Sequence, residues 1–560
     1  MNKLKYIILA IGGLVSVISC KEDNWLKEEA YDFYTVDNSY TTPEQFNSAV
    51  SYLYSLTRKA MFETEQTGYL TYFYTTDVAY CTTSLTQDLN PLSDALIPEN
   101  TGTVLKMWTL FYQIISNANL IIDRIDDESI KFTSESERNE LKAEACFFRA
   151  FAYRNLGIQW GGVPLVLDEI AQPKRDFTRA TQQEVWTQCI TDLTYAVENL
   201  PEVTEVEEDG RLTKAAANQL LAELYIITKD WDKAINCTNA IIESGNYSLM
   251  TERFGSWKDK EGDVYGDLFR RGNQNRSSGN KESIWVCQYE YQTTGGGVGN
   301  ILTRFLVPRY WKLIGDSDNK NLFIGPTSQD GGRGIGWMSA SDYLINQVWE
   351  SDENDMRNSQ YNIIRDVVAN NPKSVYYGQK IVESGAIDNY PNTYRRDWSV
   401  IFAKSAPIND FPEECIDDPE TGATNTNAQY TFRDHYYMRL AETYLLRAEA
   451  YLGKGDQSSA AADINIVRAR ANAAPVAAAD VNIDYILDER ARELHFEEFR
   501  LLTLMRLNKF TERRRLYNPM ANFTYNTNET TADYNNLWPI PQSEIETNTG
   551  ATLEQNPGYN

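Results

Sequence analysis

The stretch Met438–Ala471 reads MRLAETYLLRAEAYLGKGDQSSAAADINIVRARA, and it decides the fold. Apolar residues recur every three or four positions in each half of it, which is typical of two helices with one buried face each. They are Ala441, Tyr444, Leu445, Ala448, Tyr451 and Leu452, and then Ala460, Ile464, Val467 and Ala471. Gly453 and Gly455 interrupt the pattern and favour a short turn. The stretch therefore predicts a hairpin of two antiparallel helices.

Residues 214–241, KAAANQLLAELYIITKDWDKAINCTNAI, resemble this hairpin at a constant offset of 226 positions (448 − 222). The matched pairs are Ala222 with Ala448, Tyr225 with Tyr451, Ala234 with Ala460, Thr238 with Ile464, and Ile241 with Val467. Small residues let two helices approach closely, and a tyrosine fills the groove above them, as in tetratricopeptide repeats. The alternative is that these are two unrelated amphipathic hairpins.

The composition argues against some classes of binding partner and of catalytic or metal site. The chain has 560 residues, a net charge of −26 and a pI of about 4.6, so the phosphate backbone of a nucleic acid would be repelled. It has only two histidines, which leaves little room for histidine-based metal sites or catalytic triads. No metal, cofactor or disulfide is predicted. Aromatic residues are abundant, with 35 tyrosines and 12 tryptophans.

The N-terminus has the features of an export signal. Lys3 and Lys5 precede an apolar run at 6–19 that is short for a transmembrane helix, and Ser19 stands directly before Cys20. This pattern predicts lipoprotein cleavage and lipidation at Cys20. The alternative is an ordinary secretory signal with a coincidental cysteine.

The remaining chain divides by composition. We expect a signal peptide at 1–19, a lipidated tether at 20–42 and helices through 43–244, apart from a loop at 64–102. Residues 245–434 are rich in Gly and Asn and predict an irregular lobe with a few short strands, such as one near 283–291. Helices are expected again within 435–560, at 435–473 and about 483–508.

Five segments together resemble the SusD/RagB lipoproteins of Bacteroidetes over nearly the full length. They are the lipobox followed by Lys21-Glu22-Asp23, WGGVPLV at 160–166, RLAETYLLRAEAYL at 439–452, DERARELHFEEFRLLTLMRLNKF at 488–510, and the ending LWPIPQSEI…NPGY. The resemblance implies a mostly α fold, with a scaffold of four tetratricopeptide-like hairpins and a loop-rich lobe that carries the ligand site. Hairpins near 136–156 and 483–508 are expected only on this ground.

The resemblance also implies a function. The protein is expected to be a lipid-anchored, cell-surface component of the outer membrane. There it would capture an oligosaccharide and deliver it to a SusC-like TonB-dependent transporter, without catalysis. Three alternatives stay open: a peptide or glycopeptide ligand, a scaffold for a protein partner, and a surface glycosidase. A glycosidase needs two carboxylates across a cleft, and adjacent pairs such as Glu413–Glu414 do not indicate one.

Candidate ligand-binding residues come from two aromatic-rich stretches, 69–90 and 304–349. Aromatic rings can cover the apolar face of a sugar while polar groups bind its hydroxyls. We expect the two stretches to meet, with Trp311 and Trp337 as stacking platforms beside a flexible glycine-rich loop at 331–337. The other candidates are Tyr310, Tyr74, Tyr80, Asp77, Asn90 and Arg333. For Asp77 the alternative is a turn cap, and for Trp311 and Trp337 it is a place in the core.

Overall fold

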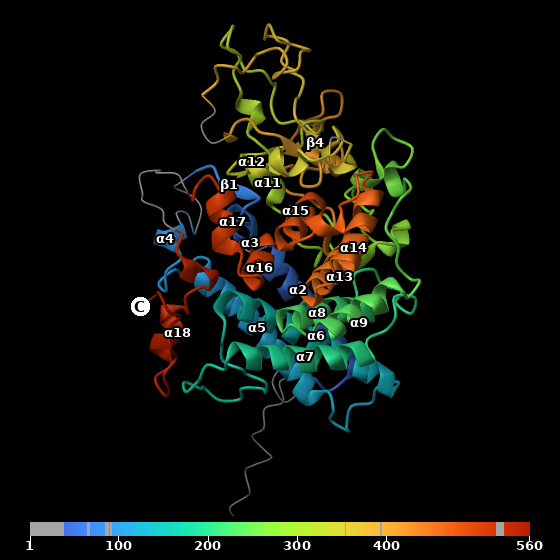
Figure 1. Ribbon diagram of the computed structural model, residues 1–560, viewed down its shortest axis with the longest axis vertical. Helices are drawn as coiled ribbons and strands as arrows, with labels where there is room; N and C mark the ends of the chain where they lie inside the picture. The colour runs from blue at the N-terminus through green and yellow to red at the C-terminus, as the bar shows by residue number, and fades with distance from the viewer. Residues whose placement is uncertain are drawn as a thin grey trace, which may run out of the picture.

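The computed structural model describes residues 39–63, 68–83, 89, 92–352, 354–391, 395–521 and 531–559. The predicted signal peptide and Cys20 lie outside them. The chain folds into a helical part and an irregular lobe, seen in yellow and lime at the top of Figure 1. The first helices are α2 (Pro43–Arg58), α3 (Gly68–Tyr74), α4 (Leu92–Ala95), α5 (Val104–Arg124), α6 (Glu135–Trp160), α7 (Gln182–Asn199), α8 (Lys214–Ile227) and α9 (Trp231–Ile242). After the lobe follow α13 (Leu440–Lys454), α14 (Gln457–Arg470), α15 (Ile483–Leu494), α16 (Arg500–Arg506), α17 (Phe510–Tyr517) and α18 (Gln542–Thr547).

The two matching hairpins are confirmed as α8–α9 and α13–α14, and α13 also packs on α9. The small residues Ala222, Ala234, Ala448 and Ala460 are all fully buried, as close helix packing requires. Consecutive helices from α5 to α9 pack pairwise, and Figure 1 shows them side by side at the base of the molecule. The mostly helical, tetratricopeptide-like fold is therefore confirmed.

The lobe is held by short antiparallel pairs rather than by one large sheet. These pairs are β1 (Ala79–Cys81) with β3 (Met338–Ala340), β2 (Ser283–Cys287) with β8 (His435–Arg439), β4 (Ile363–Ile364) with β5 (Ile401–Phe402), and β6 (Ile416–Asp418) with β7 (Ala423–Thr424). Its helices are short: α10 (Val264–Asp267), α11 (Leu302–Leu306) and α12 (Asp342–Ile345). The expectation of an irregular lobe with few strands is met.

Two helix predictions were wrong in detail, and the loop expected at 64–102 contains α3, β1 and α4. The helix expected from 435 begins only at Leu440, because 435–439 pairs with β2 as a strand. The helix expected at 483–508 is two helices, α15 and α16, because Phe496 takes a left-handed backbone conformation with φ 54°. The carboxylates Glu489 and Glu493 precede this break, and Glu497 follows it.

Those carboxylates belong to a network that we call the central ion cluster. Its six cations and six carboxylates are Arg357, Lys404, Arg439, Arg468, Arg470 and Arg492 with Glu282, Asp352, Asp355, Glu489, Glu493 and Glu497. Nearly all are buried. They come from α14, from α15 and the segment between α15 and α16, from β8 and from the irregular lobe, so the cluster joins the lobe to the helical scaffold. Burial alone would raise the pKa of Glu489, but Arg357, Arg492 and Arg468 lower it to about 2.

Candidate functional site

The structure brings together the two stretches in which the sequence placed its candidates. β1 pairs with β3 antiparallel, with Tyr80 opposite Ser339, and Thr82 N–H donates to the Trp337 carbonyl at 2.9 Å. The expected meeting of 69–90 with 304–349 is therefore confirmed. The burial and hydrogen bonding of the side chains there decide which of them can face a ligand.

Trp311 forms a cationic aromatic face with Lys312 and Arg333, which we call the Trp311 face. The Trp311 ring is half-buried, and its indole N–H donates to the Gly334 carbonyl at 2.8 Å, which fixes the ring. Lys312 Nζ lies 4.9 Å and Arg333 Cζ 5.8 Å from the ring centroid. Neither cation forms an ion pair among the described residues; Arg333 reaches only the Gln429 side chain, at 3.5 Å. Lys312 was not predicted as a site residue from the sequence. Its position next to Trp311 is the only sequence feature that could have indicated it.

The glycine-rich loop at 331–337 is packed rather than open. A Cβ on Gly334 would meet the Val307 carbonyl at 2.2 Å, and one on Gly336 would meet the Arg396 carbonyl at 2.1 Å. Gly336 also has a left-handed φ of 57°. Glycine is therefore needed here for the approach of the protein's own backbone, and the expectation of a loop free for a ligand was wrong.

Trp337 and Tyr310 contribute more to the packing of the protein than Trp311 does. Trp337 is half-buried and packs on Phe305, with ring centroids 5.2 Å apart. Tyr310 is fully buried, and its hydroxyl donates to the Gly332 carbonyl at 3.1 Å and accepts from Thr327 N–H at 2.8 Å. Trp337 keeps a surface from which it can reach a ligand; Tyr310 instead holds the glycine-rich loop.

Three candidates from the first stretch are buried. Tyr74 ends α3 and is 3% exposed, and Tyr80 in β1 is 5% exposed. Asp77 is fully buried and accepts from Arg500 Nη2 and Arg513 Nε, both at 2.7 Å. Burial alone would raise the pKa of Asp77, but the two arginines lower it to about 2. The structure therefore contradicts Asp77 as a ligand contact, and Asn90 lies outside the described residues.

Two further arginines lie close to the segments that form the Trp311 face. Arg309 pairs with Asp397 at 2.6 Å, and Arg396 donates to the Ile335 carbonyl at 3.3 Å. Burial, and then the neighbouring Arg309, lower the pKa of Arg396. Arginine and lysine donors beside an aromatic ring suit hydroxyl or carboxylate groups of a ligand.

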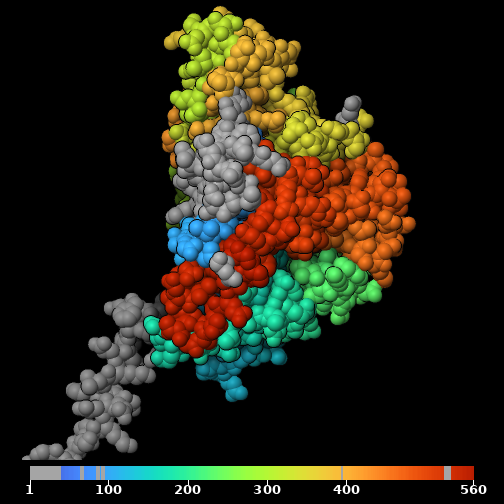
Figure 2. Space-filling view, turned by 60° about the vertical axis from the view of Figure 1, so that its left-hand side comes forward, coloured from blue at the N-terminus to red at the C-terminus, as the bar shows by residue number. Residues whose placement is uncertain are grey.

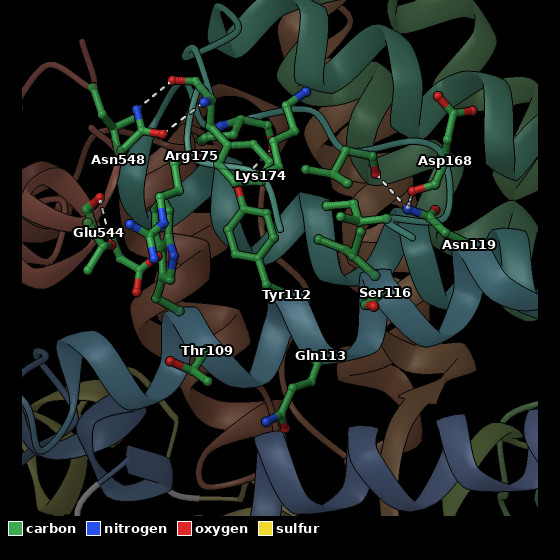
Figure 3. A pocket seen from close by; sticks show the side chains of 18 of the residues that line it. Thr109, Tyr112, Gln113, Ser116, Asn119, Asp168, Lys174, Arg175, Glu544 and Asn548 are labelled. Carbon is green, nitrogen blue, oxygen red and sulfur yellow. Dashed lines mark hydrogen bonds between the residues drawn. The ribbon is translucent and has the colours of Figure 1, made fainter. Parts of the chain in front are cut away.

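A large cavity lies elsewhere, between α5, residues 164–177 and the C-terminal segment 544–553. This α5 cleft has a volume of about 730 Å³, within the range of ligand pockets, and opens to solvent. Its lining combines apolar and aromatic residues, Trp108, Tyr112, Ile115, Pro164, Val166, Ile170, Phe177 and Leu553, with the charged residues Asp168, Lys174, Arg175, Glu544 and Glu546. Figure 3 shows Tyr112 pointing into it from α5, and Figure 2 shows the red C-terminal segment against the blue-green chain.

Hydrogen bonds make the walls of the α5 cleft rigid. Tyr112 Oη donates to the Pro164 carbonyl at 2.8 Å, and Asn119 Nδ2 donates to the Val166 carbonyl at 2.9 Å. At the far end Asn548 accepts from Phe177 N–H and donates back to its carbonyl, both at 2.8 Å. The cleft is therefore preformed.

The described residues contain no group of three or more His, Cys, Asp or Glu that could hold a metal ion. Within the same residues, no helix is long and apolar enough to cross a membrane.

Comparison with known proteins identifies relatives of the chain. A family model described as "SusD family" matches residues 266–559, and one described as "Starch-binding associating with outer membrane" matches residues 24–226. A SusD-like protein of Formosa agariphila is 26% identical over 59% of this chain, which spans 63% of that relative's length. The starch-binding protein SusD of Bacteroides thetaiotaomicron is 36% identical over 25% of this chain and 24% of its own. A solved laminarin-binding SusD-like protein matches the fold with a TM-score of 0.68 at 22% identity, covering 92% of this chain and 99% of that one.

Proposed function

Because the chain belongs to the SusD family, we propose that it captures glycans at the outer-membrane surface and passes them to a SusC-like TonB-dependent transporter. The names of its relatives support binding: one family model is described as starch-binding and associating with the outer membrane, and a relative is a starch-binding protein. Family membership establishes the fold and the class of protein, whereas glycan binding and the transporter partner are what we propose.

The observation that carries the proposal is the Trp311 face. A half-buried tryptophan, fixed by its indole N–H, offers an apolar surface to the C–H side of a sugar ring. Lys312 and Arg333 stand beside that ring with donors that no carboxylate among the described residues occupies. They would bind ring hydroxyls or an acidic substituent. Trp337 is proposed as a second platform.

The interactions of the carboxylates near the Trp311 face support binding without cleavage. Asp397 is paired with Arg309, and Asp330 is buried and accepts from Thr327 Oγ1 at 2.6 Å. Burial raises the pKa of Asp330 to about 6. A glycosidase needs two carboxyl groups that face each other across the glycosidic bond, and these two are engaged with other partners.

The direct test is purification from outer membranes solubilised in several mild detergents. We expect a large β-barrel transporter to co-elute with this chain, and the complex to bind oligosaccharides of starch or laminarin type that are recovered uncut. Recovery of the monomer alone in every detergent would contradict the proposed complex with a transporter. Released reducing sugar would contradict a binding role.

The anchor gives a separate prediction. Replacing Cys20 with alanine should move the protein from the membrane fraction to the soluble fraction, because several acyl chains on one cysteine anchor stably and their loss leaves no equivalent anchor. Fractionation and surface labelling of intact cells measure this, with Cys81→Ala, a buried cysteine, as the control. An unchanged membrane fraction for Cys20→Ala would show that the anchor lies elsewhere.

A further inference from the structure

We propose that the α5 cleft is a second carbohydrate-binding site, which holds a short neutral oligosaccharide independently of the Trp311 face. The inference rests on the proposed function, because it assigns a further site to the same class of ligand. The cleft has a volume of about 730 Å³ and opens to solvent. Its wall along α5, from Thr109 to Asn119, is about 15 Å long, so more than one sugar ring can lie along it.

Tyr112 gives the cleft a fixed aromatic surface. It is half-buried and points into the cleft from α5 (Figure 3). Its hydroxyl donates to the Pro164 carbonyl at 2.8 Å, and its ring centroid lies 5.0 Å from that of buried Trp108. Tyr112 therefore has little side-chain freedom to lose when a ligand binds, and its ring can cover the apolar C–H side of a sugar. Phe177, which is also half-buried, adds a second ring from the wall opposite α5.

The backbone of the wall opposite α5 is already hydrogen-bonded, which argues against an extended peptide in the cleft. The groups held by the protein's own side chains are the carbonyls of Pro164, Val166 and Phe177 and the N–H of Phe177. A peptide that binds by strand addition needs such backbone groups free. A sugar does not, because its hydroxyls bind to side chains.

The polar side chains that remain available suit hydroxyl groups. Asp168, Lys174 and Arg175 are exposed, and none of them forms an ion pair among the described residues. Lys174 Nζ lies 5.3 Å from the Phe177 ring centroid, so a cationic donor stands beside an aromatic ring, as at the Trp311 face. Figure 3 shows Asp168 at one end of the cleft and Arg175 at the other. A sugar hydroxyl can donate to the carboxylate and accept from the cations, so both ends can bind one ligand.

The charges of the lining select a neutral ligand. The lining contains the cations Lys174 and Arg175 and the carboxylates Asp168, Glu544 and Glu546. An acidic ligand would be repelled by the carboxylates, and a basic ligand by the cations. A neutral oligosaccharide meets neither penalty, and the aromatic rings supply the contact area that it needs.

The test titrates the soluble chain with Cys20→Ser, using maltohexaose and laminarihexaose as probes and calorimetry as the measurement. Trp311→Ala is added to isolate the α5 cleft. At least one probe should bind this variant saturably, with one molecule per chain. Ser116→Trp, at an exposed lining position on α5, should fill the cleft and weaken this binding at least about tenfold, whereas Thr191→Trp, at an exposed position on α7 outside the cleft, should not.

Two further measurements keep the test independent of one variant. Ile170→Arg, at a lining residue that is 48% exposed, should block the cleft in the same way, and unfolding midpoints of both blocking variants should equal that of Thr191→Trp. Because the ligand is neutral, its affinity should change less than about threefold between about 50 and 500 mM NaCl. A larger fall would show that charge holds the ligand and would overturn the proposal.

The outcomes distinguish the second site from the proposed function. If the chain binds one probe molecule, Trp311→Ala abolishes that binding and both blocking variants leave it unchanged, the second site is overturned and the proposed function stands. If the blocking variants abolish binding and Trp311→Ala leaves it unchanged, the α5 cleft is supported and the Trp311 face is not the site. If neither probe binds at about 10 mM, both proposals are contradicted.

Discussion

Replacing Glu493 with glutamine is expected to lower the free energy of unfolding by about 3–5 kcal/mol, because it removes one of the six carboxylates that balance the six cations of the buried central ion cluster. Glu493 Oε1 accepts from Arg439 Nη1 at 2.6 Å and from Arg470, and its Oε2 accepts from Arg357 Nη1 at 2.9 Å. All these side chains are at most 1% exposed. A glutamine has the same shape, but its amide would direct donors at arginines that can only donate.

Urea denaturation of the soluble chain measures this loss, with Glu383→Gln as a matched control. Glu383 is 75% exposed, and among the described residues its side chain forms a single ion pair, with Lys380 at 3.5 Å, so its variant should keep the unfolding midpoint. Adding Arg470→Met to Glu493→Gln removes one charge of each sign. The double variant should therefore lose less stability than the sum of the single variants. A loss below about 1 kcal/mol for Glu493→Gln would contradict a structural role for the cluster.

The hairpins α8–α9 and α13–α14 could be predicted from local pattern, because each carries its own turn and its own small residues. Ala222 and Ala448 mark the close contacts in the sequence itself. The central ion cluster could not be predicted in this way. Charged residues in DERARELHFEEFR look like the solvated face of a helix, and their partners Arg357, Lys404 and Arg439 are distant in sequence. Only the fold shows that the carboxylates are buried.

The site was predicted more coarsely than the fold. That 69–90 meets 304–349 was correct, but Tyr74, Asp77 and Tyr80 are buried. One signal was available: Tyr69, Tyr72 and Phe73 stand at helical spacing, and all three are in the core on α3. For Asp77 there was none, since its partners Arg500 and Arg513 lie more than 400 residues away in sequence.

Replacing Trp311 with alanine is expected to weaken glycan binding about five- to 150-fold, which corresponds to about 1–3 kcal/mol, a range borrowed from base–aromatic stacking. The ring is the platform, so Trp311→Phe should keep most of the affinity although it loses the hydrogen bond to Gly334. Trp337→Ala should weaken binding and also lower the unfolding midpoint, because Trp337 packs on buried Phe305. Calorimetric titration with the oligosaccharide that co-purifies with the protein measures each affinity.

Trp257 offers a matched control for the Trp311 face. It is also half-buried and also carries two cations, Lys260 Nζ at 4.0 Å and Arg270 Cζ at 3.9 Å from the ring centroid, but it lies in a different segment. Trp257→Ala should leave the affinity unchanged. If Trp311→Ala lowers the unfolding midpoint while glycan binding per folded molecule is unchanged, Trp311 is structural and the ligand site lies elsewhere. If both tryptophan variants lose affinity equally, the effect is one of general charge and packing, and the Trp311 face has no special role.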